Sequence, residues 1–263
     1  MKKIWLIFVI LLGLSNSVAL AKECSKLTIT GSPDSAPSSW VRDGKLIGAA
    51  VEYVEGISRL AGVTRIEVKV LPTWADALQA VYRGDVDVIF EANWSKERER
   101  YLDYVRPSIS TQFLNVVVRS GEAFELNTLE PLAVRSGAAP NGYGYGDGYF
   151  SAFLNKTLKL QLTPDLSGAL DLLLDKKVDF VFGYENQVFS QLMSRNLGTS
   201  LKVLNTYPTR AEGFIAFSKR SPCSAELRVR FAQQVVLANA KYTFRTLMTK
   251  YREVFDEGLT RPQ

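Results

Sequence analysis

The stretch ALQAVYRGDVDVIF at residues 77–90 decides the fold class, because a helix, a tight turn and a buried strand follow one another in it. A predicted helix through residues 75–83 ends at Gly84, and residues 86–90 form an apolar strand. The same succession returns in ALDLLLDKKVDFVF at residues 169–182. Apolar strands alternating with helices are typical of parallel sheets with crossover helices. We therefore predict two similar α/β lobes; one domain with an extended sheet is the simpler alternative.

The sequence on either side continues this alternation. The first block adds predicted strands at residues 27–30 and 66–70 and a helix whose apolar residues recur at helical spacing, namely Val51, Val54, Ile57 and Leu60. The second block is predicted to contain a helix at residues 166–174 and strands at residues 132–134, 158–162 and 178–182. Each block thus predicts a mainly parallel sheet.

Two extended segments, at residues 113–118 and 213–218, enclose the second block and are predicted to cross between the lobes. The tail from residue 226 to about residue 253 has a helical pattern, and we expect it to pack on the first lobe. The predicted organisation is a leader at residues 1–21, the first part of lobe one at 22–115, lobe two at 116–212, and a return to lobe one with C-terminal helices at 213–263.

The N-terminus has the pattern of a secretory signal peptide. Two lysines precede the apolar run at residues 4–12, and Ala19-Leu20-Ala21 fits the small-residue rule for cleavage after Ala21. A retained anchor would need roughly 20 apolar residues. A lipoprotein would need its cysteine directly after the small residues, whereas Lys22 and Glu23 intervene. The protein is therefore expected in the periplasm.

Cys24 and Cys223 are the only cysteines of the chain, and export permits a disulfide between them. Such a bond would join the start of the exported chain to its last fifth and contribute about 4–5 kcal/mol in the chain-entropy model. Two buried free thiols are the alternative. We expect the disulfide, as a crosslink within lobe one.

The composition favours binding over catalysis. The 263 residues include no histidine, which excludes Ser-His-Asp and Cys-His nucleophilic sites, His-ligated zinc and imidazole bases. Apolar and charged contents of 46% and 22% exclude wholesale disorder. The net charge of +5 falls by two when Lys2 and Lys3 leave with the leader, and the remaining charge is scattered. Nucleic acid is therefore not an expected partner, and we expect neither cofactor nor metal.

The order of six short segments resembles that of the type II periplasmic binding proteins. These segments are Ala36-Pro37, DGKLIG at residues 43–48, Trp74, GDVD at residues 84–87, SKER at residues 95–98 and LDY at residues 102–104. More narrowly, the chain is similar to the bacterial extracellular solute-binding proteins of family 3, which are typical of uptake systems for polar amino acids. The likeness covers essentially the whole exported chain and is most specific between residues 27 and 107.

This resemblance implies a monomeric α/β receptor with two Rossmann-like lobes joined by two extended hinge crossings, the Venus flytrap architecture. Such a receptor captures a small carboxylate-bearing solute, an amino acid or an analogue, in the cleft between the lobes. It then presents the solute to the membrane permease of an ABC transporter.

Arg98 is the first candidate ligand-binding residue. Ser95 is a good N-cap for a helix starting at Lys96, and a cation in the first turn opposes the helix macrodipole. A bound anion would explain an arginine at this position, since its guanidinium and the free backbone N–H groups of the first turn could together bind a carboxylate. The residues alone fit a solvated charged face equally well. The resemblance implies that Arg98 grips the carboxylate of the solute.

Three further candidates lie at the ends of elements in lobe one. Trp74 begins a helix, and the resemblance implies an aromatic platform for the solute; core packing is the alternative. Glu91 and Asn93 follow the buried strand at its carboxyl end, where open α/β sheets place ligands. Glu91 replaces the small hydroxyl residues of the family and would meet a cationic group of the solute or form a surface salt bridge.

Lobe two departs further from the family pattern. Ser136, Gly137 and Ala138 occupy the turn that donates to the carboxylate, where Ala138 leaves only a backbone N–H. The ammonium-binding aspartate of the family aligns with Tyr184, and the neighbouring Glu185 is the candidate to replace it.

Two more departures concern aromatic residues. Ser35 stands where the family has an aromatic residue before Ala-Pro. From this departure together with those at Ala138 and Tyr184, we predict a carboxylated solute decorated differently from a standard α-amino acid. The segment GYGYGDGY at residues 142–149 fits neither nucleotide-binding glycine motif. It is predicted to be a surface loop or, alternatively, an aromatic wall of the cleft.

Two other functions remain open on the sequence. A few proteins on this scaffold are dehydratases of the cyclohexadienyl type, for which Glu91 or Glu185 would supply the acid. The other function is that of a ligand-sensing module for a membrane signalling partner. No residue in the sequence distinguishes such a module from a transport receptor.

Overall fold

The computed structural model describes Cys24 and residues 26–143, 156–204, 210–223, 225–241 and 243–260. The predicted leader lies outside these ranges, as does the segment at 142–149 after Tyr143. Within the described ranges, no helix has both the length and the apolar character needed to cross a bilayer.

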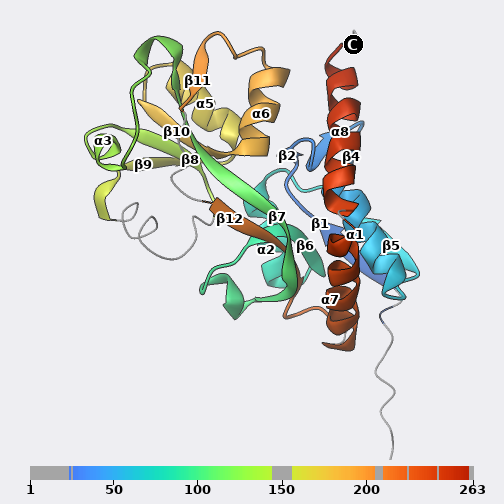
Figure 1. Cartoon of the computed structure of the whole chain (residues 1–263). Coiled ribbons are helices and arrows are strands. Elements are labelled where there is room, and N and C mark those ends of the chain that lie inside the picture. Colours follow the sequence, from blue (N-terminus) through green and yellow to red (C-terminus); the bar gives the residue numbers. More distant parts are fainter. Residues whose placement is uncertain are drawn as a thin grey trace, which may run out of the picture.

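One twisted sheet passes through both lobes (Figure 1). Its strands in the described residues are β1 (Lys26–Thr30), β5 (Arg65–Val68), β6 (Val88–Asn93), β7 (Leu102–Arg119), β8 (Gly137–Pro140), β9 (Leu160–Thr163), β10 (Phe180–Tyr184), β11 (Leu201–Val203) and β12 (Arg210–Ser218). Their order is β5-β1-β6-β12-β7-β10-β8-β9, and β11 pairs with β7. A separate antiparallel sheet contains β2 (Asp34–Ser35), β3 (Ser39–Arg42) and β4 (Lys45–Ile47).

The helices cover both faces of this sheet (Figure 1). The described α-helices are α1 (Ala49–Leu60), α2 (Trp74–Arg83), α3 (Glu130–Ala133), α5 (Leu166–Leu174), α6 (Glu185–Ser194), α7 (Ala225–Ala240) and α8 (Thr243–Thr260). Two short 3-10 turns, η1 (Arg98–Arg100) and η2 (Ser120–Glu122), flank β7.

Strand β6 is buried on both faces, as its apolar sequence predicts. Val88 and Phe90 enter the core formed with α1 and α7, whereas Ile89 and Ala92 enter the core formed with α2. The parallel pairing of β1 with both β5 and β6 confirms the predicted parallel sheet in lobe one.

Lobe two is layered in the same way. Val116 and Val118 of β7 lie in a core with the aromatic side chains of β10, and Val117 lies in the opposite core with α5. Strand β8 pairs in parallel with β9 and β10. Two similar α/β lobes are thus confirmed.

Two long neighbouring strands connect the lobes (Figure 1). Strand β7 pairs antiparallel with β12 from Leu102–Ser218 to Phe113–Arg210. The later part of β7 pairs antiparallel with β10. The sheet is therefore continuous from one lobe to the other through this pair.

The predicted strand at residues 132–134 is wrong, because α3 occupies this position. Pro131 suits the first turn of a helix, where its missing N–H is not needed. Leu132 is fully buried while Val134 is 86% exposed, so no buried strand can pass through both. The strand of this region is β8, five residues further on.

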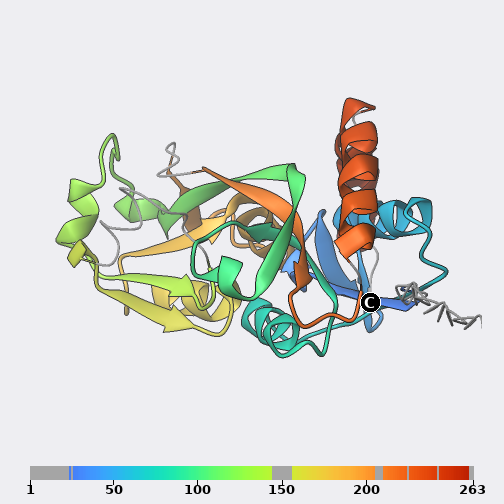
Figure 2. The same ribbon diagram turned by 90° about the horizontal axis from the view of Figure 1, so that it is seen from below.

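The C-terminal helices pack beside α1 (Figure 2). Leu227, Phe231 and Val235 of α7 are buried in the core shared with α1. The predicted disulfide between Cys24 and Cys223 is present, with their Cα atoms 5.1 Å apart. It joins the residues preceding β1 to those preceding α7.

Candidate functional site

A small cavity of about 30 Å³ lies where the two lobes meet. Residues of both lobes line it, namely Ser32, Ser35, Trp74, Glu91, Asn93, Gln112, Tyr143, Tyr184 and Gln187. Four of the sequence candidates, Trp74, Glu91, Asn93 and Tyr184, are thus brought together here. The cavity is this small because the lobes lie in direct contact around it. It has room for about one water molecule.

Arg98 lies at the same contact and is only 6% exposed. Its guanidinium donates to the carbonyl oxygen of Asn93 at 2.9 Å and to that of Gly142 in lobe two. The solvated alternative for Arg98 is therefore excluded. The expected helix from Lys96 is a single 3-10 turn, although the Ser95 hydroxyl does accept from the Arg98 N–H at 3.2 Å. So short a turn carries no appreciable macrodipole, and Arg98 is held by its side-chain bonds instead.

Trp74 contacts the same carbonyl from the start of α2. Thr73 and Asp76 form a capping box that fixes the first turn of this helix. The indole N–H of Trp74 donates to the Gly142 carbonyl oxygen at 3.1 Å. One lobe-two oxygen thus accepts two donors of lobe one, and Trp74 is half-buried at the cleft besides packing beside the α2 core.

Asn93 and Tyr184 form a second link between the lobes. The Asn93 side-chain amide donates to the Tyr184 hydroxyl at 2.6 Å, and the Tyr184 ring stacks at a tilt on Tyr143 with 5.2 Å between centroids. Burial raises the pKa of Tyr184 above that of a free tyrosine, so the hydroxyl stays protonated. A neutral tyrosine thus replaces the acidic residue expected at this position.

Glu91 is buried in the cleft with a backbone conformation rare outside glycine. Its φ is +56°, in the left-handed region, and its side chain is 7% exposed. The Ser38 hydroxyl donates to Oε2, while Oε1 has no hydrogen-bond partner among the described residues. Burial raises the pKa of this carboxyl above its usual range. The surface salt-bridge alternative for Glu91 is therefore wrong.

The sequence analysis missed a third polar link across the cleft. The Gln187 side-chain amide donates to Asp34 at 2.6 Å and to the Ser32 hydroxyl at 3.3 Å, and its carbonyl oxygen accepts from Tyr143. Burial raises the pKa of Asp34, which the Gln187 bond partly opposes. The only signal in the sequence was the position of Gln187 in the first turn of a helix that follows a buried strand.

Four lobe-two candidates lie away from the small cavity. Ser136 is exposed, and its N–H and hydroxyl both donate to Asp179, at 2.7 and 2.8 Å. Gly137 and Ala138 belong to β8, where Ala138 is buried in the core and a side chain at Gly137 would collide with the Phe180 ring. The structure therefore gives no turn of free N–H groups here. Glu185 is exposed and lines a neighbouring, larger cavity.

The two lobes, their paired crossings and the polar cleft between them define a periplasmic-binding-protein fold of type II. Residues 27–261 match the bacterial extracellular solute-binding proteins, family 3, and the chain belongs to this family. No curated protein sequence matches the chain.

Three solved structures share the fold. An amino-acid ABC transporter substrate-binding protein from Streptococcus pneumoniae, bound to L-arginine, is 18% identical with a TM-score of 0.72, covering 90% of this chain and 97% of that one. The arginine-, lysine-, histidine-binding protein ArtJ from Geobacillus stearothermophilus is 18% identical, with a TM-score of 0.70 and coverage of 86% and 94%. A histidine kinase sensor domain is 22% identical, with a TM-score of 0.70 and coverage of 86% and 95%.

Proposed function

We propose that this protein is a periplasmic receptor that takes a small carboxylate-bearing solute, an amino acid or an analogue, into the interlobe cleft. It delivers this solute to the membrane permease of an ABC transporter. The observation that carries the proposal is the convergence of Arg98 and Trp74 of lobe one on one carbonyl oxygen of lobe two. Both donors are aimed at an acceptor in the cleft, and a solute carboxylate is a stronger acceptor for a guanidinium than a peptide carbonyl.

The solute would replace the Gly142 carbonyl as the partner of Arg98. Lobe separation would first break the Arg98 and Trp74 bonds to Gly142, after which the solute carboxylate would take both donors and the lobes would close over it. The small Ser35 and the neutral Tyr184 leave room and polarity for a solute that differs from a standard α-amino acid.

Calorimetry with the purified exported chain tests this proposal against a panel of amino acids and small carboxylates. For a solute that binds, we expect Arg98→Ala to weaken binding by about 30-fold to several thousand-fold, because removing one partner of a buried charge pair costs about 2–5 kcal/mol. Arg98→Lys should also weaken binding, since the forked donor geometry is lost.

Arg100→Ala is the matched control, because Arg100 is an exposed arginine of the same 3-10 turn. Circular dichroism should show that all three variants remain folded. Unchanged affinity in Arg98→Ala would contradict the proposed site.

A sensing role is the second candidate, favoured by the likeness in fold to a histidine kinase sensor domain. The cleft would be the same, and the partner would be a membrane sensor rather than a permease. Co-purification from membranes in the presence and absence of the bound solute distinguishes the two partners.

The buried Glu91 favours a third candidate, an acid-catalysed elimination, because its raised pKa is the property of a general acid. Incubation with prephenate and with arogenate tests it directly. Absence of product from both would exclude a dehydratase of this type.

A further inference from the structure

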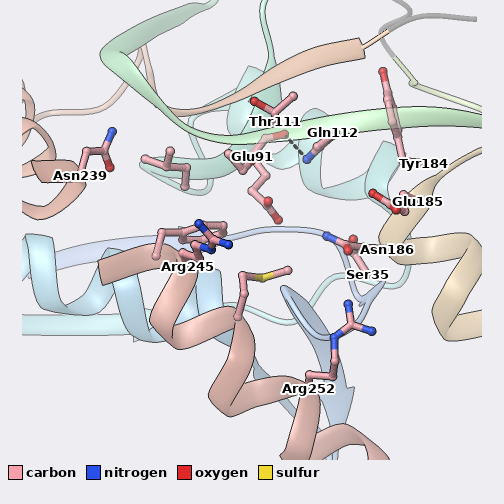
Figure 3. A pocket seen from close by; sticks show the side chains of 14 residues that line it. Ser35, Glu91, Thr111, Gln112, Tyr184, Glu185, Asn186, Asn239, Arg245 and Arg252 are labelled. Carbon is pink, nitrogen blue, oxygen red and sulfur yellow. Dashed lines mark hydrogen bonds between the residues drawn. The ribbon is translucent and has the colours of Figure 1, made fainter. Parts of the chain in front are cut away.

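A second cavity, of about 460 Å³, adjoins the cleft (Figure 3). It lies between the C-terminal parts of β6 and β10, the middle of β7 and one face of α8. It shares Ser35, Glu91, Gln112 and Tyr184 with the small cavity. Its size falls in the usual range of small-molecule sites. Helix α8 takes no part in the proposed solute site around Arg98.

The side chain of Glu91 is aimed into this cavity (Figure 3). Ser38 donates to Oε2, whereas Oε1, near the polar side chains of Ser110 and Gln112, accepts no hydrogen bond from the described residues and is the atom left for a ligand. A buried carboxylate oxygen without a partner costs about 1–3 kcal/mol or more. Such atoms are rare in folded proteins and point to a bound group that satisfies them.

The opposite wall carries two guanidinium groups. Arg245 and Arg252 both line the cavity with Met248 between them, and their spacing of three and four residues puts all three on one face of α8. The Arg252 guanidinium lies over the Phe189 ring at 4.8 Å. Arg245 is exposed, and Figure 3 shows its guanidinium turned toward the cavity.

A ligand between these walls meets an acceptor on one side and cationic donors on the other. We propose that the cavity binds an elongated zwitterion whose amino group donates to Glu91 and whose carboxylate pairs with Arg245 and Arg252. The site is distinct from the Arg98 site, although the two share a wall.

The separation of the two walls selects the ligand class. Glu91 is on β6 and the arginines are on α8, with the cavity between them. In an α-amino acid the ammonium and carboxylate groups share one carbon atom, so it would reach only one wall. An ω-amino carboxylate separates the same two groups by a flexible chain and can reach both.

Isothermal titration calorimetry with 4-aminobutanoate, 6-aminohexanoate and 8-aminooctanoate tests the proposal, beside hexylamine and hexanoate as single-charge probes. We expect at least one ω-amino carboxylate to bind at least about tenfold more tightly than either single-charge probe. Arg245→Ala should weaken its binding, and Arg245→Ala combined with Arg252→Ala should reduce its affinity to that of hexylamine. Glu91→Gln should reduce it to that of hexanoate.

Lys250→Ala is the matched control, because Lys250 is a cation of the same helix that pairs with Glu52 and does not line the cavity. It should leave affinity within about twofold of wild type. Thermal melts of every variant exclude unfolding as the cause of a loss.

Three results would each overturn the proposal. One is the absence of binding by all three ω-amino carboxylates, and another is equal binding of hexylamine or hexanoate. The third is a loss of 6-aminohexanoate binding in Arg98→Ala with none in Arg245→Ala, which would place that probe in the cleft. The proposed Arg98 site would fail by a different result, namely an amino acid that binds Arg98→Ala as tightly as the wild type.

Discussion

The buried carboxyl of Glu91 shows most clearly how one residue departs from ordinary protein chemistry. It combines a left-handed backbone, nearly complete burial and an oxygen without a partner in the described chain. Each of these features destabilises the fold, and backbone strain of this kind gathers at binding and catalytic sites.

Glu91→Gln should stabilise the protein at neutral pH. Because burial raises the folded pKa of Glu91 above 4.5, its ionisation is penalised only in the folded state, and stability falls as pH rises from about 4.5 through the folded pKa. The gain in melting temperature should be largest near pH 8, at about 2–4 °C per kcal/mol relieved, and should vanish near pH 4.

Thermal melts across this pH range measure the effect. Three other charged groups line the cavity with Glu91, namely Glu185, Arg245 and Arg252. Their own titration is common to both proteins, whereas their interaction with ionised Glu91 exists only in the wild type and is part of the measured difference. Glu253→Gln, an exposed carboxyl on α8, is the control and should show no such trend. A gain that is independent of pH would contradict the ionisation argument.

At the scale of elements, predictability from sequence followed local signals. The helix predicted at residues 166–174 has the bounds of α5, and the helix ended by Gly84 is α2, because each has a residue that fixes its end. The strand predicted at 132–134 failed because three apolar residues carry no periodicity that separates a strand from a helical turn.

The candidate site was predictable only where a local sequence pattern marks its residues. Glu91, Asn93 and Tyr184 lie at the ends of buried strands, which the apolar runs reveal. Gln187 was missed because its partner Asp34 is 153 positions away in the sequence. Nothing local in either segment specifies which residue of the other lobe it meets.

The capping box of α2 offers a test at this scale. Thr73→Ala removes the hydroxyl that accepts from the Asp76 N–H at 3.1 Å, which should lower stability by about 1 kcal/mol, or about 2–4 °C in melting temperature. It should also weaken solute binding, because Trp74 is the first residue of this helix. Thr199→Ala, an exposed threonine outside the helices, is the control; an equal loss in both would contradict the capping role.

For the whole molecule, the C-terminal helix is a contact between lobes as well as part of lobe one. Phe189 of α6 packs against Phe255 of α8 with 6.2 Å between centroids, and the Arg252 guanidinium lies over the Phe189 ring at 4.8 Å. Trp40 completes the cluster by packing edge-on against Phe255. These apolar contacts hold α6 beside α8 at the edge of the larger cavity.

Phe189→Ala should favour the separated lobes. Loss of the aromatic pair and the cation–π contact removes about 1–2.5 kcal/mol from the closed form, which shifts the equilibrium about 5- to 70-fold. Small-angle X-ray scattering of the solute-free protein should show a larger radius of gyration.

Phe124→Ala is the control. This substitution also removes a contact between a guanidinium and a phenyl ring, that of Arg135 with Phe124, but both residues belong to lobe two. An unchanged radius in Phe189→Ala would contradict the role of this contact. An equal increase in both variants would do the same.

The pairing of β7 with β12 also limits how this molecule can move. Two separate linkers would let the halves twist, slide and tilt. These two strands are instead paired with each other from Leu102–Ser218 to Phe113–Arg210, with one register shift between Gly213 and Ile215. Sliding one strand past the other would break that ladder, while flexing the ribbon across its width leaves it intact. We therefore expect the lobes to separate by rotation about one axis, so that groups parted when a ligand enters would meet again in the same alignment.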